Sequence, residues 1–215
     1  FSSDALNKTF FHAHGTSTPQ NRESESHIIS SISKAFGIEA LPVTAIKSYL
    51  GHSLAAAGGD QMISTLGSWK NSIIPGITST PELAENVHRE NVEFLLQNKK
   101  FDGEDYDFAV LNAKGFGGNN GTALVASPSK TMKMLETKYS KKDIQAYLLK
   151  KRKIDTQLDK YKAEVLQGDI KSRYMFGEDV IDGMNDFEIE TDKITNKLNK
   201  EIFNLNSTLP YKEYL

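Results

Sequence analysis

Short apolar runs alternate with longer amphipathic runs along the first part of the chain, and this alternation predicts strands and helices in turn. The run KTFFHAHGT indicates a strand that ends at Gly15. Residues 21–36 carry apolar side chains at helical spacing, with acidic residues early in the run, as helix dipoles prefer. Residues 43–48 (VTAIKS) indicate a second strand, and residues 53–70 a second helix that begins with small side chains.

Two short runs, 72–78 and 93–97, are further extended candidates. Residues 107–113 and 121–127 indicate two buried strands, joined by the glycine-rich turn KGFGGNN, and this arrangement suits a hairpin. The order strand, helix, strand, helix and then hairpin predicts an α/β fold in which helices layer a sheet.

The composition changes near residue 129, because all five histidines and five of the six prolines lie before it. We therefore expect a core domain at 1–128 and a C-terminal extension at 129–215. In the extension, Ser140 is an N-cap signal for a long amphipathic helix at about 140–167, and Gly168 is a plausible stop. The lysine-rich face of this helix is expected to be solvated. We expect residues 172–215 to be irregular and to wrap over a larger body through the aromatic anchors Tyr174, Phe176, Phe203 and Tyr211.

The 215 residues suffice for one sizeable domain with an appendage, and 38% of them are hydrophobic. The net charge of −2 predicts no strong field for nucleic acid or a membrane surface. No run of eighteen apolar residues and no signal-peptide pattern is present, so we expect a cytoplasmic protein without a membrane span. The first residue, Phe1, is not Met, which favours a fragment or a processed product.

The chain contains no cysteine. This excludes disulfides, thiolate zinc sites and a covalent thiol mechanism carried by the chain alone. A metal site at HAHGT was considered, because His12 and His14 would share one face of a strand. Two imidazoles are too few ligands and no third ligand is fixed nearby by spacing, so we expect no metal. Histidines simply paired at a strand end remain the alternative.

Two further stretches carry candidate chemistry. In AIKSYLGHSLAAAGG, Lys47 is expected at a strand end and His52 at a helix N-terminus, where the dipole favours neutral imidazole. An ordinary helix start, with His52 capping and Lys47 solvated, explains this stretch as well. In NAKGFGGNNG, the glycine density suits a hairpin turn, a phosphate nest or backbone N–H donors placed against a reacting oxygen. The stretch lacks the context of a dinucleotide loop and the Lys-Ser/Thr end of a P-loop.

In this order, the motifs HGTSTPxN…E, KSxxGHxxAAAG and GFGGNN resemble the C-terminal half of the β-ketoacyl-acyl-carrier-protein synthases. These are condensing enzymes of the thiolase fold, and the resemblance covers about residues 9–127. FGEDV and the closing LPYKEYL are similar to the C-terminal extension of bacterial stand-alone synthases. The resemblance implies the C-terminal half of a thiolase fold, with a mixed sheet, layered helices and a helical or irregular tail.

The resemblance also implies an activity, the decarboxylative Claisen condensation of acyl and malonyl thioesters in fatty acid or polyketide synthesis. His14 and His52 would stabilise the enolate and oxyanion, and Lys47, paired with Glu25, would support the charge network. Substrates would be carried on the phosphopantetheine of acyl carrier protein, with no separate cofactor. The remaining positions carried over are the gate and its oxyanion N–H at Phe116, flanked by Gly115 and Gly117, and the carrier-arm hydroxyls of Thr16 and Thr18.

The implied partners are acyl carrier protein and the N-terminal half of the same synthase, with a homodimer in the parent protein. The family's nucleophilic cysteine lies in that N-terminal half, so this chain alone is expected to be inactive. The chain departs from the family pattern at Arg22, Ile46 and Lys114, where the family often has Asp, Thr and Phe. These departures keep open a non-condensing relative, either a decarboxylase or a chain-length-factor-like partner. A non-enzymatic binding module has only the basic helix in its favour.

Overall fold

The structure is a computed structural model that describes residues 6–103, 105–169 and 183–205. The chain forms two compact units, Phe1–Leu148 and Leu149–Leu215, which are described separately. The first unit therefore contains the predicted core together with the beginning of the predicted extension. The expected domain boundary near residue 128 stays a prediction.

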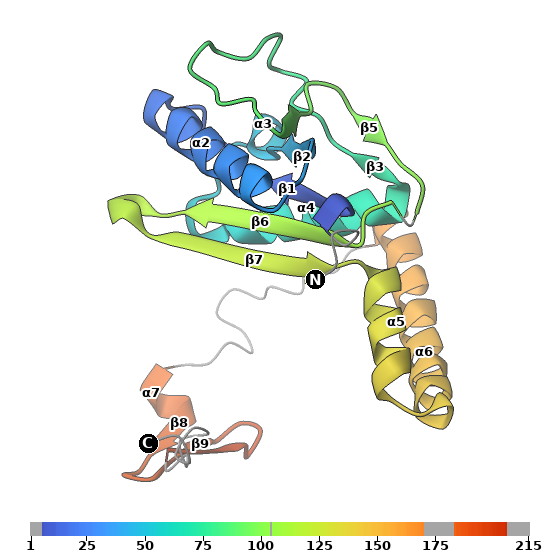
Figure 1. Cartoon of the computed structure of the whole chain (residues 1–215). Coiled ribbons are helices and arrows are strands. Elements are labelled where there is room, and N and C mark those ends of the chain that lie inside the picture. Colours follow the sequence, from blue (N-terminus) through green and yellow to red (C-terminus); the bar gives the residue numbers. More distant parts are fainter. Residues whose placement is uncertain (1–5, 104, 170–182, 206–215) are drawn as a thin grey trace. The chain divides into compact units, whose positions relative to one another are not determined.

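A five-stranded sheet forms the centre of the first unit (Figure 1). Its order is β4-β2-β1-β6-β7; the first four strands run parallel to their neighbours and β7 runs antiparallel to β6. The predicted hairpin is correct, with Phe108 opposite Ala126 and Lys114 opposite Asn120. The expectation that both of its strands are buried is wrong for β7, which lies at the edge of the sheet and is mostly exposed. The sheet is mixed, as predicted. The strands are β1 (Thr9–His12), β2 (Leu41–Thr44), β4 (Val92–Phe94), β6 (Phe108–Lys114) and β7 (Asn120–Ala126).

Two helices cover opposite faces of this sheet, α2 (Pro19–Ala35) and α4 (Ala57–Asn71) (Figure 1). Successive residues of a strand point to opposite faces. Accordingly, Phe10 of β1 packs in one core cluster with Trp69 of α4, and Phe11 packs in another with Ile29 of α2. The two faces of a single short strand therefore hold the two layers together.

The shorter elements of the first unit are α3 (Lys47–Leu50), the 3-10 turns η1 (Leu54–Ala56) and η2 (Phe116–Gly118), and α5 (Pro128–Lys138). A separate antiparallel pair joins β3 (Ile73–Ile74) and β5 (Lys99–Lys100). Both extended candidates overlap a strand, but β3 and β4 are shorter than the runs that indicated them, and β4 begins one residue before its run.

Two strand predictions extended too far. The first strand ends at His12, before Gly15, and β2 ends at Thr44 instead of continuing to residue 48. After Ala45 the chain turns, because the N–H of Ser48 donates to Ala45 O and Tyr49 N–H donates to Ile46 O. These local bonds satisfy the backbone as a helix, so Lys47 begins α3 and does not end a strand.

The long helix α6 (Lys141–Leu166) lies close to the helix expected over 140–167 and continues from the first unit into the second. Ser140 accepts the N–H of Asp143 at 3.2 Å, as an N-cap does, and Gly168 adopts φ +81° just beyond the helix. None of the helices in the described part of the chain combines the length and the hydropathy that a membrane span requires.

The second unit also contains the short helix α7 (Gly183–Asp186) and a three-stranded antiparallel sheet of order β10-β9-β8. These strands are β8 (Phe187–Ile189), β9 (Lys193–Asn196) and β10 (Ile202–Asn204). The expectation of an irregular segment over 172–215 is therefore wrong at these strands. Of the four aromatic anchors, Phe203 lies in β10, and Tyr174, Phe176 and Tyr211 lie outside the described residues.

Candidate active site

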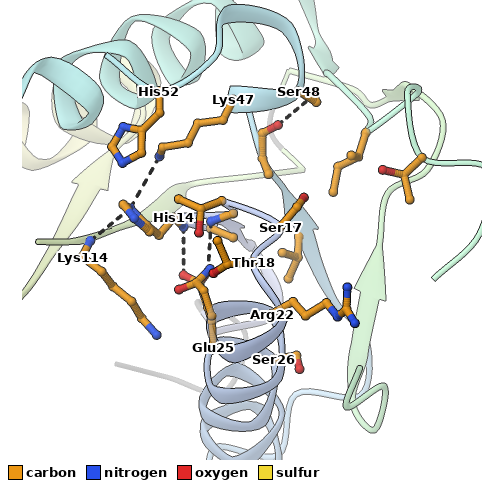
Figure 2. Close-up of a pocket in the computed structure, with 18 of the residues that line it drawn as sticks. His14, Ser17, Thr18, Arg22, Glu25, Ser26, Lys47, Ser48, His52 and Lys114 are labelled. Carbon is orange, nitrogen blue, oxygen red and sulfur yellow. Dashed lines mark hydrogen bonds between the residues drawn. The ribbon is translucent and has the colours of Figure 1, made fainter. Parts of the chain in front are cut away.

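The three motifs that the sequence singled out meet at one cavity of about 1380 Å³ in the first unit (Figure 2). The cavity is lined by residues that follow β1, by the first turns of α2, by the α3–η1 segment and by the end of β6. Of the predicted site residues, Gly117 alone is not among the lining residues. The predicted site residues that line the cavity are His14, Thr16, Thr18, Glu25, Lys47, His52, Gly115 and Phe116. Gly15 and Lys114, which belong to the same motifs, line it as well.

The chain turns sharply at Gly15, directly after His14. Gly15 has φ +55°, a left-handed conformation that favours glycine, and a Cβ built there would lie 2.5 Å from the Cβ of Ala45. The turn places the backbone N–H groups of His14 and Gly15 against the Glu25 carboxylate, at 2.8 and 3.0 Å. The Glu25 carboxylate of α2 therefore holds the backbone at His14 in place.

Glu25 is buried and its carboxylate collects four hydrogen bonds. Besides the two backbone N–H groups, Asn21 Nδ2 donates at 3.1 Å and Asn112 Nδ2 donates at 2.7 Å. In the part of the chain that the structure describes, no ion pair at salt-bridge distance joins Lys47 to Glu25, and the pairing of their charges stays a prediction. The four neutral donors already occupy the carboxylate oxygens, and Glu25 acts on Lys47 only through its charge at longer range.

Lys47 contacts His14 instead. Its Nζ lies 3.5 Å from His14 Nδ1, and the backbone N–H of Lys114 donates to the same nitrogen at 3.1 Å (Figure 2). With donors facing Nδ1, the neutral ring carries its proton on Nε2. Burial, followed by the charge of Lys47, lowers the pKa of His14 below its ordinary value. His14 is thus held as a neutral imidazole with an Nε2–H donor.

The Lys47 ammonium is half-buried, and burial lowers its pKa while the charges of Glu25 and Asp60 act in the opposite direction. The second histidine, His52, lies between α3 and η1 with its ring centroid 5.1 Å from that of His14, in an edge-to-face arrangement. His52 Nδ1 accepts the N–H of Leu54 at 3.1 Å, which leaves the Nε2 proton as a donor. The N-cap of the 3-10 turn that follows is Ser53 and α4 begins only at Ala57, so His52 does not cap the expected helix; its contact with Leu54 instead orients it for hydrogen bonding through the other nitrogen.

The glycine-rich turn stands at the rim of the cavity. The Phe116 side chain is 92% exposed, and Gly117 adopts φ +78° within η2. Thr16 is half-buried and Thr18, which precedes the first turn of α2, is exposed. The structure brings all of these residues to the cavity wall except Gly117, which shapes the turn that carries Phe116.

His12 has no place in the cavity. Its ring is fully buried against Phe10, and within the described residues neither ring nitrogen has a hydrogen-bond partner. Burial, followed by the charge of Lys47, lowers the pKa of His12 to about 4. Among the described residues no group of three or more His, Cys, Asp or Glu side chains is placed to hold a metal. The two histidines of HAHGT therefore have different environments.

Sequence reasoning assigned no role to three amides that the structure places at the site. Asn21 and Asn112 bind the carboxylate of Glu25, as described above. Gln61 of α4 is fully buried, and its Nε2 donates to the carbonyls of Ala13 and Asn112, both at 2.9 Å. Asn112 is the first residue of the stretch NAKGFGGNN, and this position was the only feature of the sequence that could have pointed to a role for it. No feature of the sequence pointed to Gln61, because a single amide side chain in a helix does not indicate which groups it will bind.

The chain is similar to known proteins over two different extents. Residues 7–80 match the family model described as "Beta-ketoacyl synthase, C-terminal domain". The 3-oxoacyl-[acyl-carrier-protein] synthase 2 of Vibrio harveyi is 32% identical over 116 residues, which cover 53% of this chain and 26% of that protein. Each of these two matches covers only part of the chain.

The likeness to one protein extends further. The β-ketoacyl-[acyl-carrier-protein] synthase FabY of Pseudomonas aeruginosa is 40% identical over 187 residues, covering 87% of this chain and 29% of that protein. The crystal structure of the ketosynthase FabY from the same organism matches 99% of this chain and 33% of that chain, with a TM-score of 0.82 and 36% identity. The chain thus spans about a third of the length of this relative, and the similarity includes residues beyond the predicted core.

Proposed function

Because this chain carries the C-terminal domain of a β-ketoacyl synthase, we propose that it supplies the histidine-bearing half of an active site for decarboxylative condensation. In this reaction a malonyl thioester loses CO₂ and becomes an enolate. The enolate carbon then attacks the carbonyl of an acyl thioester, and the sulfur of that thioester leaves as a thiolate. The site has to stabilise negative charge on the thioester oxygen of the enolate.

One observation carries the proposal. Two imidazoles, His14 and His52, lie 5.1 Å apart at their centroids, and each accepts a backbone N–H at Nδ1. Both therefore present an Nε2–H donor without having to lose a proton. The Lys47 ammonium, 3.5 Å from His14 Nδ1, adds positive charge to the same wall. Fixed donors beside a positive charge are suited to an oxyanion that forms during reaction.

The chain has no cysteine, so the thiol that takes the acyl group is proposed to come from the N-terminal half of the same synthase. This chain alone is then inactive. By similarity to relatives named as acyl-carrier-protein synthases, acyl carrier protein is the proposed partner, with no separate cofactor. Thr16 and Thr18 at the cavity mouth are the proposed contacts of the carrier arm, and Phe116 is the proposed gate.

The experiment compares the full-length parent synthase with its His14→Ala and His52→Ala variants. Each variant is expected to lose condensation of acyl- and malonyl-carrier protein by roughly 10²–10³-fold, as for removal of one oxyanion donor. His27→Ala, which removes an exposed histidine that does not line the cavity, serves as the matched control and is expected to keep the wild-type rate. Undiminished condensation in either site variant contradicts the proposed roles.

A non-condensing relative is the second candidate, and two cavity residues favour it. Arg22 and Lys114 line the cavity where the resembled family often has an acid and an aromatic ring. Such a protein would release CO₂ from malonyl-carrier protein without joining a second acyl group. Measuring CO₂ and β-ketoacyl product in the same reaction separates the two: equal amounts support condensation, and CO₂ without product supports the alternative.

A further inference from the structure

The connection between β3 and β4, residues 75–91, has neither helix nor strand and is called the strap below (Figure 1). Long connections without regular structure are uncommon in compact domains and are usually lids or binding loops. Both ends of the strap are fixed, because Tyr49 Oη donates to Gly76 O at 2.7 Å and Asn91 Nδ2 donates to Ile38 O at 3.0 Å. Between these ends, residues of the strap form part of the cavity wall.

The part of the cavity beside the strap is apolar. Ile29 and Val43 belong to a buried core cluster, and Ile77 and Phe94 pack against that cluster. All four side chains line the cavity, and the middle of the strap adds two more, so that the apolar lobe comprises Ile29, Val43, Ile77, Leu83, Val87 and Phe94. The lobe lies in the same cavity as His14 and His52. Such a surface binds alkyl groups, because binding removes apolar area from water on both sides.

Arg22 joins helix α2 to the middle of the strap. Its Nε donates to Asn86 Oδ1 at 2.9 Å, and Asn86 Nδ2 donates to Glu23 Oε2 at 3.4 Å. As far as the structure describes the chain, Asn86 is the only residue within 79–87 that forms a hydrogen bond with a group outside the strap. The middle of the strap is therefore held against α2 at a single place.

The side chain of Arg22 lines the cavity and extends away from His14 (Figure 2). An ionised aspartate, which the resembled family often has at this position, carries no donor for the oxygen of Asn86. The departure from the family pattern at Arg22 thus coincides with the contact that holds the strap.

We propose that Arg22 is a positioning residue that, through Asn86, holds the strap as one wall of the apolar lobe, and that this lobe receives the alkyl chain of the acyl thioester. The inference rests on the proposed function, because that function supplies the acyl thioester. The lobe continues from the wall that carries the two histidines, where the thioester group reacts, so a chain that extends from this group can enter it. Without the contact to Arg22, the middle of the strap is released and a long chain loses its apolar surroundings. A chain too short to reach the lobe is unaffected.

The test compares acetyl and octanoyl donors in condensation by the full-length synthase. Arg22→Met keeps a long side chain but removes the donor to Asn86. We expect kcat/KM for the octanoyl donor to fall roughly fivefold through KM, as for the loss of one hydrogen bond, and both constants for the acetyl donor to keep their wild-type values. Asn86→Ala should give the same change, and the double variant no more than either alone, because both substitutions remove one shared contact.

The matched control is Lys34→Met. Lys34 of α2 also faces the strap, at 3.9 Å from Glu90, but this exposed pair lies outside the cavity wall. Exposed ion pairs contribute little, so both donors should react as in the wild type.

A second variant tests the lobe itself. Val87 is half-buried and borders the cavity, so Val87→Phe places a ring in the lobe where there is space for it. The octanoyl donor should then react roughly tenfold more slowly or worse, and the acetyl donor should react as before.

An octanoyl rate in Val87→Phe equal to that of the wild type would overturn the inference. So would an equal loss for both donors in either Arg22→Met or Val87→Phe, because that is the mark of a purely structural role. Failure of the proposed function shows differently, as a wild-type parent that makes no β-ketoacyl product from either donor.

Discussion

The two sides of the cavity are built in different ways. The anchored side, which comprises His14, Glu25 and Asn112, is tied by hydrogen bonds between β1, α2 and β6, and Glu25 alone accepts four of them. The exposed side comprises His52 and Phe116. His52 is solvent-exposed and accepts a hydrogen bond from the N–H of Leu54, two residues further along the chain, and Phe116 is 92% exposed. One side is organised by tertiary structure and the other by short local segments.

This difference shows what each side contributes. On the anchored side, the donors and acceptors have their geometry fixed before any substrate arrives, which is the condition for stabilising a charge that develops during reaction. On the exposed side, the backbone conformation is set by positive-φ glycines and one short turn, with few side-chain contacts. Substitutions on the anchored side should therefore alter folding as well as activity, and those on the exposed side should alter activity alone.

The largest effect is expected for Glu25→Ala. The substitution leaves two backbone N–H groups and the amides of Asn21 and Asn112 without their shared acceptor. At roughly 1 kcal/mol for each lost bond, we expect the free energy of unfolding to fall by about 4 kcal/mol. Urea denaturation of this chain measures it, and Glu39→Ala, at an exposed carboxylate, should change it by less than about 0.5 kcal/mol. Equal stability of the two variants would remove the distinction between the sides.

The next largest effect is the pH dependence of the free energy of unfolding that His12, two residues before His14, should cause. Its folded pKa of about 4 lies below the ordinary value of 6.5, so the unfolded chain binds the proton more tightly. The stabilisation is fully present above pH 6.5 and is lost as the pH falls through about 4, amounting to about 3 kcal/mol between pH 7 and 4. Denaturation curves across this range should show a smaller pH dependence for His12→Leu than for wild type. An unchanged slope would mean that His12 titrates normally in the fold.

A smaller loss is expected for Gln61→Leu. The amide of Gln61 joins the carbonyls of Ala13 and Asn112, and so links the strand before His14 to the strand that carries Lys114. Leucine fills a similar volume but removes both of these hydrogen bonds, for a loss of about 2 kcal/mol in unfolding free energy. Ile63→Ala, on the exposed face of the same helix, is the matched control and should cost less than about 0.5 kcal/mol. Equal free energies of unfolding for the two variants would show that the hydrogen bonds of Gln61 do not stabilise the anchored side.

The smallest effect on stability is expected for Phe116→Ala. The ring is almost wholly exposed, so little apolar burial is lost and the free energy of unfolding should change by less than about 0.5 kcal/mol. In the full-length parent the same variant should nevertheless slow condensation, because Phe116 is the proposed gate. Calorimetry of this chain and the condensation assay together test the contrast. A strongly destabilised variant would show that the exposed side is packed in solution.

The family and the mixed α/β sheet were predicted from the sequence and are confirmed. The roles of His14, Lys47 and His52 remain predictions, but their meeting at one cavity is a structural finding. The described residues show no ion pair at salt-bridge distance between Lys47 and Glu25, because backbone N–H groups and two amides bind the carboxylate. Those donors come from residues 14, 15, 21 and 112. A sequence pattern does not show which donors from separate segments will bind the same carboxylate in the fold.

The sequence by itself determined the alternation of strands and helices, the hairpin at the glycine-rich turn and the motifs that identify the family. These features depend on local periodicity, on glycine's access to positive φ and on the order of short motifs. The motifs also singled out His14 of HAHGT as the site residue, and only the tertiary structure decided that His12 lies fully buried against Phe10. It also decided that Lys47 faces His14, and that Gln61 joins two strands. Such contacts depend on which groups fold within hydrogen-bond distance of one another, and sequence separation does not measure that distance.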